Sequence, residues 1–218
     1  MQPAIGLYGG TFDPVHHAHL RLALEVREAL GLAGLRFVPC HVPALRAAPG
    51  ASGEQRRAML ELAIRGEPGL SVDDRELRRS GPSYTIDTLA SLRAELGPEV
   101  PLVWLLGADA WAQLPRWRDW QRLTDFAHLA VLARPGAAAC ETPVDPALAA
   151  FLAEHRADPG CLRERAAGGV WFQPASLLDI SASAVRAALR AGRSARYWLP
   201  EAVLDYIARH GLYRPAGA

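Results

Sequence analysis

The sequence contains no lysine, and arginine accounts for all 24 of its basic residues. This absence excludes Schiff-base chemistry on a lysine amine, as well as phosphate loops that end in lysine. Arginine supplies all fixed positive charge, and its guanidinium suits bidentate contacts to phosphate. The 23 acidic residues leave a formal net charge of +1, and the basic residues form no stripe of the kind that nucleic-acid-binding proteins show. We therefore expect no nucleic-acid partner.

Cysteine is scarce and long apolar runs are missing. Cys40, Cys140 and Cys161 are odd in number and widely spaced, which argues against a disulfide framework and a thiolate zinc site. No apolar run approaches the roughly 18 residues that span a membrane, and no basic stretch followed by an apolar one opens the chain. We expect a cytoplasmic protein without membrane association, and we assign no residue as a metal ligand.

Three common signatures are also absent. The chain has no Gly-x-x-x-x-Gly-Lys-[Ser/Thr] loop, no Gly-x-Gly-x-x-Gly fingerprint and no Gly-x-Ser-x-Gly elbow. A P-loop protein, a typical dehydrogenase and an α/β hydrolase are therefore disfavoured. Any phosphate that this protein binds must be held by a different arrangement.

Short apolar runs alternate with helical patterns along the chain. Strands are expected at residues 4–8, 35–39, 70–73, 101–107, 128–133 and 170–172. Helices are expected from about residue 20 to 30, at 52–65, 84–96 and 146–156, after residue 180 and around residues 199–207. This alternation predicts an α/β fold with a doubly wound, mostly parallel sheet. The length of 218 residues suits one domain, with a variable insertion at about 137–169 and a helical part at about 181–214.

The first strand is followed by a turn with clustered histidines, Gly9-Gly10-Thr11-Phe12-Asp13-Pro14-Val15-His16-His17-Ala18-His19. The two glycines allow close backbone approach to a ligand, and the helix that follows offers free N–H groups to an anion. His16 and His19 are three residues apart and point the same way. We interpret His17 as a solvated bystander. The turn therefore predicts a phosphate site, although a plain strand-to-helix turn remains an alternative.

A second candidate anion site lies near the end of the chain. The stretch Ile180-Ser181-Ala182-Ser183-Ala184-Val185-Arg186 places two hydroxyls at a helix start and an arginine one turn later. An ordinary serine N-cap with a surface arginine would have the same pattern. Ser181 and Arg186 are the residues on which an anion site here would depend.

These two stretches resemble the H-x-G-H and I-S-x-[ST]-x-x-R signatures of the nucleotidylyltransferase superfamily. The landmarks between and after them resemble those of bacterial nicotinate-nucleotide adenylyltransferases in order and spacing. These landmarks are Pro82-Ser83-Tyr84-Thr85, Gly107-Ala108-Asp109, Leu114-Pro115-Arg116-Trp117, Arg134-Pro135-Gly136 and Gly211-Leu212-Tyr213-Arg214. The resemblance covers nearly the whole chain and implies a Rossmann-like nucleotidylyltransferase fold.

The resemblance implies that ATP condenses with nicotinate mononucleotide to give deamido-NAD and pyrophosphate, with Mg²⁺ accompanying ATP. The attacking phosphate is already anionic, so the reaction needs alignment and charge neutralisation but no protein nucleophile. His16, His19 and Arg186 are the implied catalytic residues, acting on the ATP phosphates. The full implied ATP site comprises Gly9, Gly10, Thr11, Phe12, His16, His19, Gly107, Asp109, Ile180, Ser181 and Arg186.

The second substrate carries a pyridinium ring with a carboxylate. Thr85 and the adjoining backbone N–H groups at a helix start suit the carboxylate, and Trp117 can stack on the cationic ring. Helix capping is the alternative role of Thr85 and of Asp109, and core packing is that of Trp117. The residues implied for nicotinate mononucleotide are Tyr84, Thr85, Asp109, Trp117, Arg134 and Arg46.

Two positions depart from the family pattern. Ala18 replaces the glycine of H-x-G-H, and its methyl group narrows the approach to ATP. The loop that normally reads Pro-Pro-His-Lys is Pro43-Ala44-Leu45-Arg46, so an imidazole is lost while the cation remains. His41 is a candidate substitute donor.

Other readings of the chain stay open at this stage. A related enzyme could use another acceptor, such as nicotinamide mononucleotide, phosphopantetheine or glycerol phosphate. A dinucleotide-binding module without catalysis is the alternative from a different class. The sequence leaves the oligomeric state open, a homo-oligomer included, and it does not say whether protein groups bind Mg²⁺.

Overall fold

The computed structural model describes residues 2–45, 47–133, 144–176 and 178–214. Its centre is a six-stranded sheet with the strand order β4-β2-β1-β6-β7-β8. All neighbouring strands pair in parallel. The strands are β1 (Ile5–Gly10), β2 (Gly34–Pro39), β4 (Leu70–Val72), β6 (Leu102–Gly107), β7 (His128–Ala133) and β8 (Val170–Pro174). The predicted doubly wound parallel sheet is confirmed.

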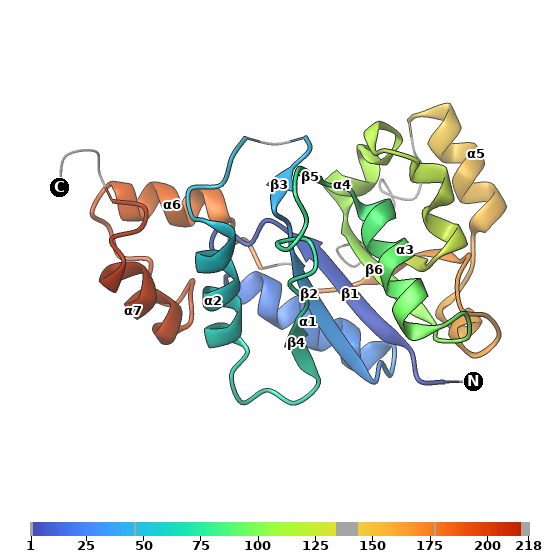
Figure 1. Cartoon of the computed structure of the whole chain (residues 1–218), viewed down its shortest axis with the longest axis horizontal. Coiled ribbons are helices and arrows are strands. Elements are labelled where there is room, and N and C mark those ends of the chain that lie inside the picture. The colour runs from blue at the N-terminus through green and yellow to red at the C-terminus, as the bar shows by residue number, and fades with distance from the viewer. Residues whose placement is uncertain (1, 46, 134–143, 177, 215–218) are drawn as a thin grey trace.

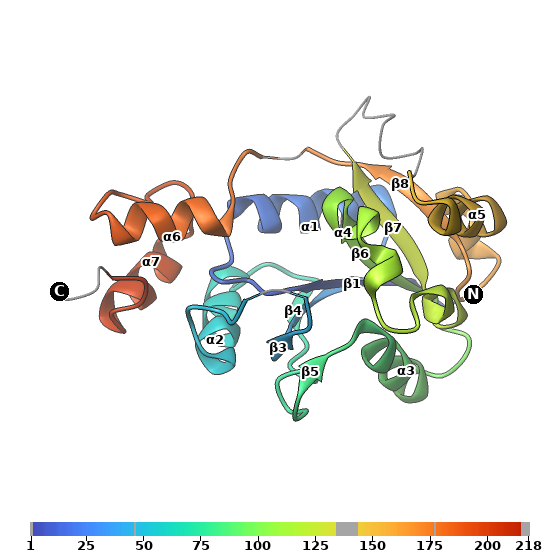
Figure 2. The same cartoon turned by 90° about the horizontal axis from the view of Figure 1, so that it is seen from above.

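Helices cover both faces of this sheet (Figure 1). They are α1 (His17–Ala29), α2 (Gly53–Ala63), α3 (Thr85–Leu96), α4 (Ala108–Ala112), α5 (Pro146–His155), α6 (Ala182–Arg190) and α7 (Glu201–Arg209), with short 3₁₀ segments at Leu114–Arg116, Trp120–Asp125 and Pro159–Arg163. Figure 2 shows α1 on one side of the sheet and α3 on the other. The helices α6 and α7 lie beside α2, at the end of the molecule opposite to α5.

The strand sequences explain why both faces are covered. All of β7 and the first five residues of β6 are buried, as the continuous apolar runs in these segments predict. Alternate residues point to opposite faces, so that Leu105 packs into one core cluster and Leu106 into the other. One cluster joins the sheet to α1, α2, α6 and α7, and the other joins it to α3, α4 and α5.

The structure corrects several predicted boundaries. The first helix begins at His17, three residues earlier than the predicted start at Leu20, and the last strand continues to Pro174. The loop predicted at residues 40–51 contains a short strand β3 (Val42–Pro43), which pairs with β5 (Pro82–Ser83) in a second, two-stranded sheet. Strands of two residues carry no periodicity that a sequence could reveal.

The order of the strands locates the place where a ligand would bind. Numbered along the chain, the six strands lie in the order 3-2-1-4-5-6, which is that of dinucleotide-binding Rossmann folds. The connections change direction between β1 and β6, and ligands of such sheets bind beyond the carboxyl ends of the strands at this point. Gly10 ends β1 and Gly107 ends β6, so both lie at that edge. Among the described helices, none has the length and apolar composition that crossing a membrane requires.

Candidate active site

The turn after β1 lies at the change of direction in the sheet. His16 is the extended N-cap residue of α1, and Phe12 has a left-handed backbone with φ of 50°. Such a conformation is strained for a bulky residue and is concentrated at functional turns. The Phe12 ring packs edge-on against Tyr8, Phe37 and His19, and these contacts hold the turn in place.

Packing within the protein already accounts for the two glycines of this turn. A Cβ atom on Gly9 would lie 2.2 Å from the Trp104 ring, and one on Gly10 would lie 2.8 Å from the Phe12 ring. Both distances are too short for any side chain, so packing against these protein rings already requires glycine at both positions. Gly107 differs, because it is exposed and a Cβ there would meet nothing within 4 Å.

His16 and His19 form a stacked pair at the start of α1. Their ring centroids are 3.7 Å apart with 25° between the planes. The backbone N–H of His16 donates to Nδ1 of His19 over 3.3 Å, which leaves the proton of a neutral His19 on Nε2. Burial lowers the pKa of His16 to about 4, with a smaller effect of His17, and burial and the charge of His16 lower the pKa of His19. Both rings are therefore neutral N–H donors at pH 7.

Asp13 connects this turn to distant parts of the chain. Its carboxylate is 4% exposed and accepts hydrogen bonds from the Gly50 N–H (2.7 Å), the Ala51 N–H (3.1 Å) and the Tyr213 hydroxyl (2.6 Å). Tyr213 belongs to one of the landmarks of the family, but the sequence suggested no role for it or for Asp13. Neither residue was predicted as part of the site.

The second predicted anion motif meets the first through Arg186. Its Nη1 donates to the backbone carbonyl of Asp13 over 2.6 Å and lies 3.6 Å from the Asp13 carboxylate. Ser181 is the N-cap of α6 and accepts from the Ala184 N–H over 3.1 Å, so the capping role is real. Its hydroxyl proton remains available to a ligand. The structure thus brings together two motifs that are separated by most of the chain.

Arg56 is a further residue that sequence reasoning missed. Its side chain is buried, and it donates to the carbonyls of Thr11 (2.7 Å), Cys40 (2.6 Å), His41 (3.3 Å) and Ala51 (3.3 Å). It therefore joins the turn after β1 to the loop at residues 40–51. No sequence signal distinguishes it from Arg57 beside it, since a buried arginine is recognised only by its surroundings.

Two of the residues predicted for the second substrate, Tyr84 and Thr85, lie at the start of α3. Tyr84 is the N-cap of α3 without a side-chain cap bond, and Thr85 is the first helical residue, so capping by Thr85 is wrong. Arg118 lies over the Tyr84 ring at 5.0 Å and connects this helix start to the loop that carries Trp117. Trp117 is half-buried and packs against the core cluster of α3, which supports its packing role.

Of the remaining residues predicted for the second substrate, only Asp109 lies in the part of the chain that the structure describes. Asp109 is exposed in the first turn of α4, but Gly107 is the N-cap, so the capping alternative for Asp109 is also wrong. Arg46 and Arg134 lie outside the described residues. The N–H of His41 donates to Oγ of Ser83 over 2.9 Å, which holds the loop at residues 40–45 beside the start of α3.

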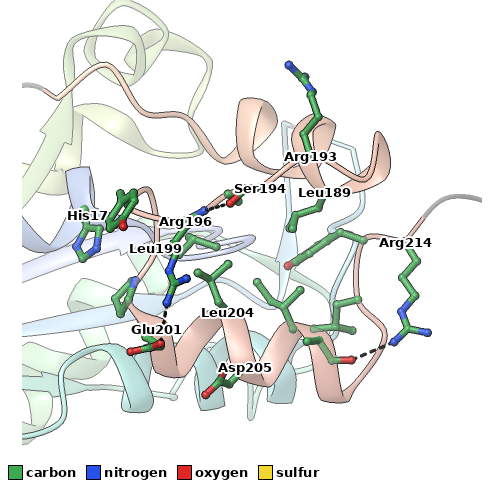
Figure 3. Close-up of a pocket in the computed structure, with 17 residues that line it drawn as sticks. His17, Leu189, Arg193, Ser194, Arg196, Leu199, Glu201, Leu204, Asp205 and Arg214 are labelled. Carbon is green, nitrogen blue, oxygen red and sulfur yellow. Dashed lines mark hydrogen bonds and ion pairs between the residues drawn. The ribbon is translucent and has the colours of Figure 1, made fainter.

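A cavity of about 850 Å³ lies between α6, α7 and the segment after α7 (Figure 3). Its wall includes His17, Arg193, Arg196 and Tyr213, with an apolar floor that includes Leu199. His17 thus lines this cavity, whereas His16 and His19 do not. Among the residues that the structure describes, none that was predicted to bind substrate lines this cavity.

Comparison with known proteins identifies the family. Residues 7–188 match the family described as Cytidylyltransferase-like. A protein of Cellvibrio japonicus named probable nicotinate-nucleotide adenylyltransferase is 48% identical over 98% of this chain and 100% of its own. A protein of the same name from Marinobacter nauticus is 49% identical, with 95% of each chain covered. The chain belongs to the nicotinate-nucleotide adenylyltransferase family.

Solved structures share the fold of this family member. Plasmodium falciparum nicotinic acid mononucleotide adenylyltransferase in complex with NaAD aligns with a TM-score of 0.73, covering 97% of this chain and 98% of that one at 19% identity. The same enzyme in complex with APC gives a TM-score of 0.71. The predicted nucleotidylyltransferase fold is confirmed.

Proposed function

We propose that this protein transfers the adenylyl group of ATP to nicotinate mononucleotide, as a step of NAD biosynthesis. An oxygen of the mononucleotide phosphate attacks the α-phosphorus, the bond from that phosphorus to the bridging oxygen breaks, and pyrophosphate leaves with the electron pair. The products are deamido-NAD and pyrophosphate. The observation that carries the proposal is the contact between Arg186 and Asp13, which joins two anion-binding motifs at the edge of the sheet where nucleotides bind.

The turn after β1 is suited to hold the ATP phosphates. Neutral His16 and His19 offer N–H groups whose hydrogen bonds strengthen as charge accumulates on the leaving pyrophosphate. We assign the β and γ phosphates to Arg186 and Ser181, with Ile180 beside them. The backbone of residues 9–12 completes this side of the site. Gly107 and Asp109 suit the nucleoside of ATP, because both are exposed at the carboxyl end of β6.

The start of α3 is suited to the carboxylate of nicotinate. The N–H groups of a first helical turn favour an anion, and the hydroxyl of Thr85 adds a donor. Tyr84 and Trp117 are held near each other through Arg118 and provide aromatic faces for the cationic ring. We assign Arg46 and Arg134 to the same substrate on the basis of the family pattern.

Magnesium fits this site as a companion of ATP. Among the described residues, no three His, Cys, Asp or Glu side chains gather closely enough to hold a metal. The Asp13 carboxylate is already engaged by three donors, whereas that of Asp109 is exposed. Mg²⁺ commonly binds through substrate phosphates with few protein ligands. When bound, it would neutralise phosphate charge, and Asp109 is the carboxylate best placed to add a ligand.

We propose the cytoplasm as the compartment in which this reaction occurs. Cys40 and Cys161 are both free thiols, which suits a reducing environment.

A pyrophosphate-release assay tests the proposed reaction. Purified protein, ATP and Mg²⁺ are incubated with nicotinate mononucleotide, nicotinamide mononucleotide, phosphopantetheine or glycerol phosphate in separate reactions. We expect the fastest release with nicotinate mononucleotide, together with deamido-NAD as the second product. Faster release with phosphopantetheine or glycerol phosphate would identify a different acceptor, and no release with any of them would indicate a binding module.

A further inference from the structure

Three other segments of the chain contact the buried carboxylate of Asp13. It receives the Gly50 and Ala51 N–H groups from one loop and the Tyr213 hydroxyl from the segment after α7. Arg186 of α6 approaches it as the fourth partner. A buried carboxylate is stable only when hydrogen bonds satisfy its oxygens. The four donors around Asp13 are therefore alternatives for the same two oxygens.

The geometry shows which donors satisfy this carboxylate. Tyr213 and Ala51 bond to Oδ1, at 2.6 and 3.1 Å, and Gly50 bonds to Oδ2 at 2.7 Å. The guanidinium of Arg186 stays 3.6 Å from Oδ2, too far for a good hydrogen bond, and donates to the backbone carbonyl of Asp13. The Asp13 carbonyl thus orients the guanidinium of Arg186. The other N–H groups of this guanidinium form no hydrogen bond with the carboxylate.

Tyr213 is fitted closely to this position. Its side chain is buried, and a Cβ atom on Gly50 would lie 3.2 Å from its ring, so only glycine gives the ring full room. Burial and the hydrogen bond to Asp13 raise the pKa of Tyr213 far above the physiological range. The hydroxyl therefore remains a proton donor at every pH at which the protein works.

We propose that Tyr213 is a positioning residue for ATP, because its hydrogen bond to Asp13 keeps Arg186 free to bind phosphate. Without the hydroxyl, Oδ1 would retain only the Ala51 N–H, and the nearest strong donor would be Arg186. A small rotation would turn the 3.6 Å approach into a bidentate pair of guanidinium and carboxylate. ATP would then have to break that pair before its phosphates could bind. This inference rests on the proposed function only in that Arg186 binds the phosphates of ATP.

The test is a comparison of Tyr213→Phe with Tyr206→Phe. Tyr206 lies in α7, and no described hydrogen bond uses its hydroxyl, so it controls for the loss of a tyrosine hydroxyl nearby. ATP binding is measured directly by isothermal titration calorimetry at low temperature. Thermal unfolding of each variant shows whether it is folded. We expect Tyr213→Phe to raise the dissociation constant for ATP about tenfold. Tyr206→Phe should leave it unchanged, and the KM for nicotinate mononucleotide should stay the same in both variants.

A double-mutant cycle separates positioning from a general structural role. In an Arg186→Gln background there is no guanidinium for Asp13 to recruit, so Tyr213→Phe should change ATP affinity by less than about twofold. An equal loss in both backgrounds, an unchanged dissociation constant, or a matching rise in the KM of the mononucleotide would overturn the inference. Normal ATP binding without pyrophosphate release by the unmodified protein would instead refute the proposed function alone.

Discussion

At the scale of single residues, two side chains to which the sequence assigned no role, Arg56 and Asp13, make the contacts that connect the candidate site. Arg56 donates to four backbone carbonyls, and Asp13 collects three donors from other segments. Both are buried polar side chains, and burying such side chains destabilises the fold unless their polar atoms have hydrogen-bond partners. The partners come from positions far away in the chain, so local patterns could not predict them. His16 and His19 were predicted because three-residue spacing is a local property.

His19 is the residue on which the proposed chemistry depends most clearly. We expect His19→Ala to remain folded and to lower kcat by roughly 10²- to 10³-fold, because it removes an N–H donor that acts mainly in the transition state. The measurement is steady-state pyrophosphate release with ATP and nicotinate mononucleotide. His17→Ala is the matched control, since His17 faces the cavity of Figure 3, and it should retain normal turnover. A folded His19→Ala protein with normal kcat would exclude the assigned role.

At the scale of helices and strands, the elements predicted correctly are those with a long pattern of apolar residues in the sequence. The runs that form β6 and β7 are buried along nearly their whole length, and the helix predicted at residues 52–65 is α2, which begins with a capping box of Ser52 and Gln55. The two-residue strands β3 and β5 were missed, as was the five-residue helix α4. Short elements such as these are fixed by neighbours in space, and intrinsic propensity decides little over so few residues.

The start of α3 predicts a preference for the acid over the amide. A carboxylate gains from the free N–H groups of the first turn, whereas a neutral carboxamide gains less. Arg118, which lies 3.7 Å from Asp87, offsets the negative charge that Asp87 brings to this turn. We expect kcat/KM for nicotinate mononucleotide to exceed that for nicotinamide mononucleotide at least about tenfold, a difference of about 1.4 kcal/mol.

Thr85→Val is a matched variant for the comparison of nicotinate and nicotinamide mononucleotides. It keeps the shape of the side chain and all backbone N–H groups, so the preference should shrink without disappearing. The KM for ATP should not change. Equal kcat/KM values for the two mononucleotides in the unmodified protein would show that α3 does not select the carboxylate.

At the scale of the whole molecule, the parallel sheet determines where the chemistry can occur. The strand order places the ends of β1 and β6 side by side, and the segments after α6 fold back onto the turn after β1. The N–H of His17 donates to the carbonyl of Trp198, and Tyr213 bonds to Asp13. Stability and site geometry are therefore coupled, because the C-terminal segment packs on the turn that carries the candidate site.

This coupling and the buried histidines predict that acid weakens the fold. Burial lowers the pKa of His128 to about 4, and its ring accepts from the Gly169 N–H while bonding to the Arg165 carbonyl. The unfolded chain binds protons at a pKa near 6.5, so between pH 6.5 and 4 it binds more protons than the native state. The free energy of unfolding should fall on acidification from pH 7 to pH 5, by about 2 kcal/mol for one such histidine.

Urea unfolding at the two pH values measures this loss. His128→Gln should show a smaller difference between pH 7 and pH 5, because one of the buried histidines that cause this difference is gone. Glu76 acts in the opposite direction, since burial raises its pKa, and the comparison of the two proteins cancels its effect. The same pH difference in His128→Gln as in the unmodified protein would show that His128 does not titrate as predicted.

The sequence alone determined the fold class and, through its resemblance to known enzymes, the family, and it predicted two anion motifs, because apolar periodicity, glycine turns and residue spacing are local properties of the chain. Only the tertiary structure decided that Asp13 joins these motifs through Arg186, that Arg56 connects the first of them to the loop at residues 40–51 and that Tyr213 bonds to Asp13. It also showed that Gly9 and Gly10 are required by the rings of Trp104 and Phe12. Such contacts depend on which segments the sheet brings together, and that order is set by the packing of the whole chain.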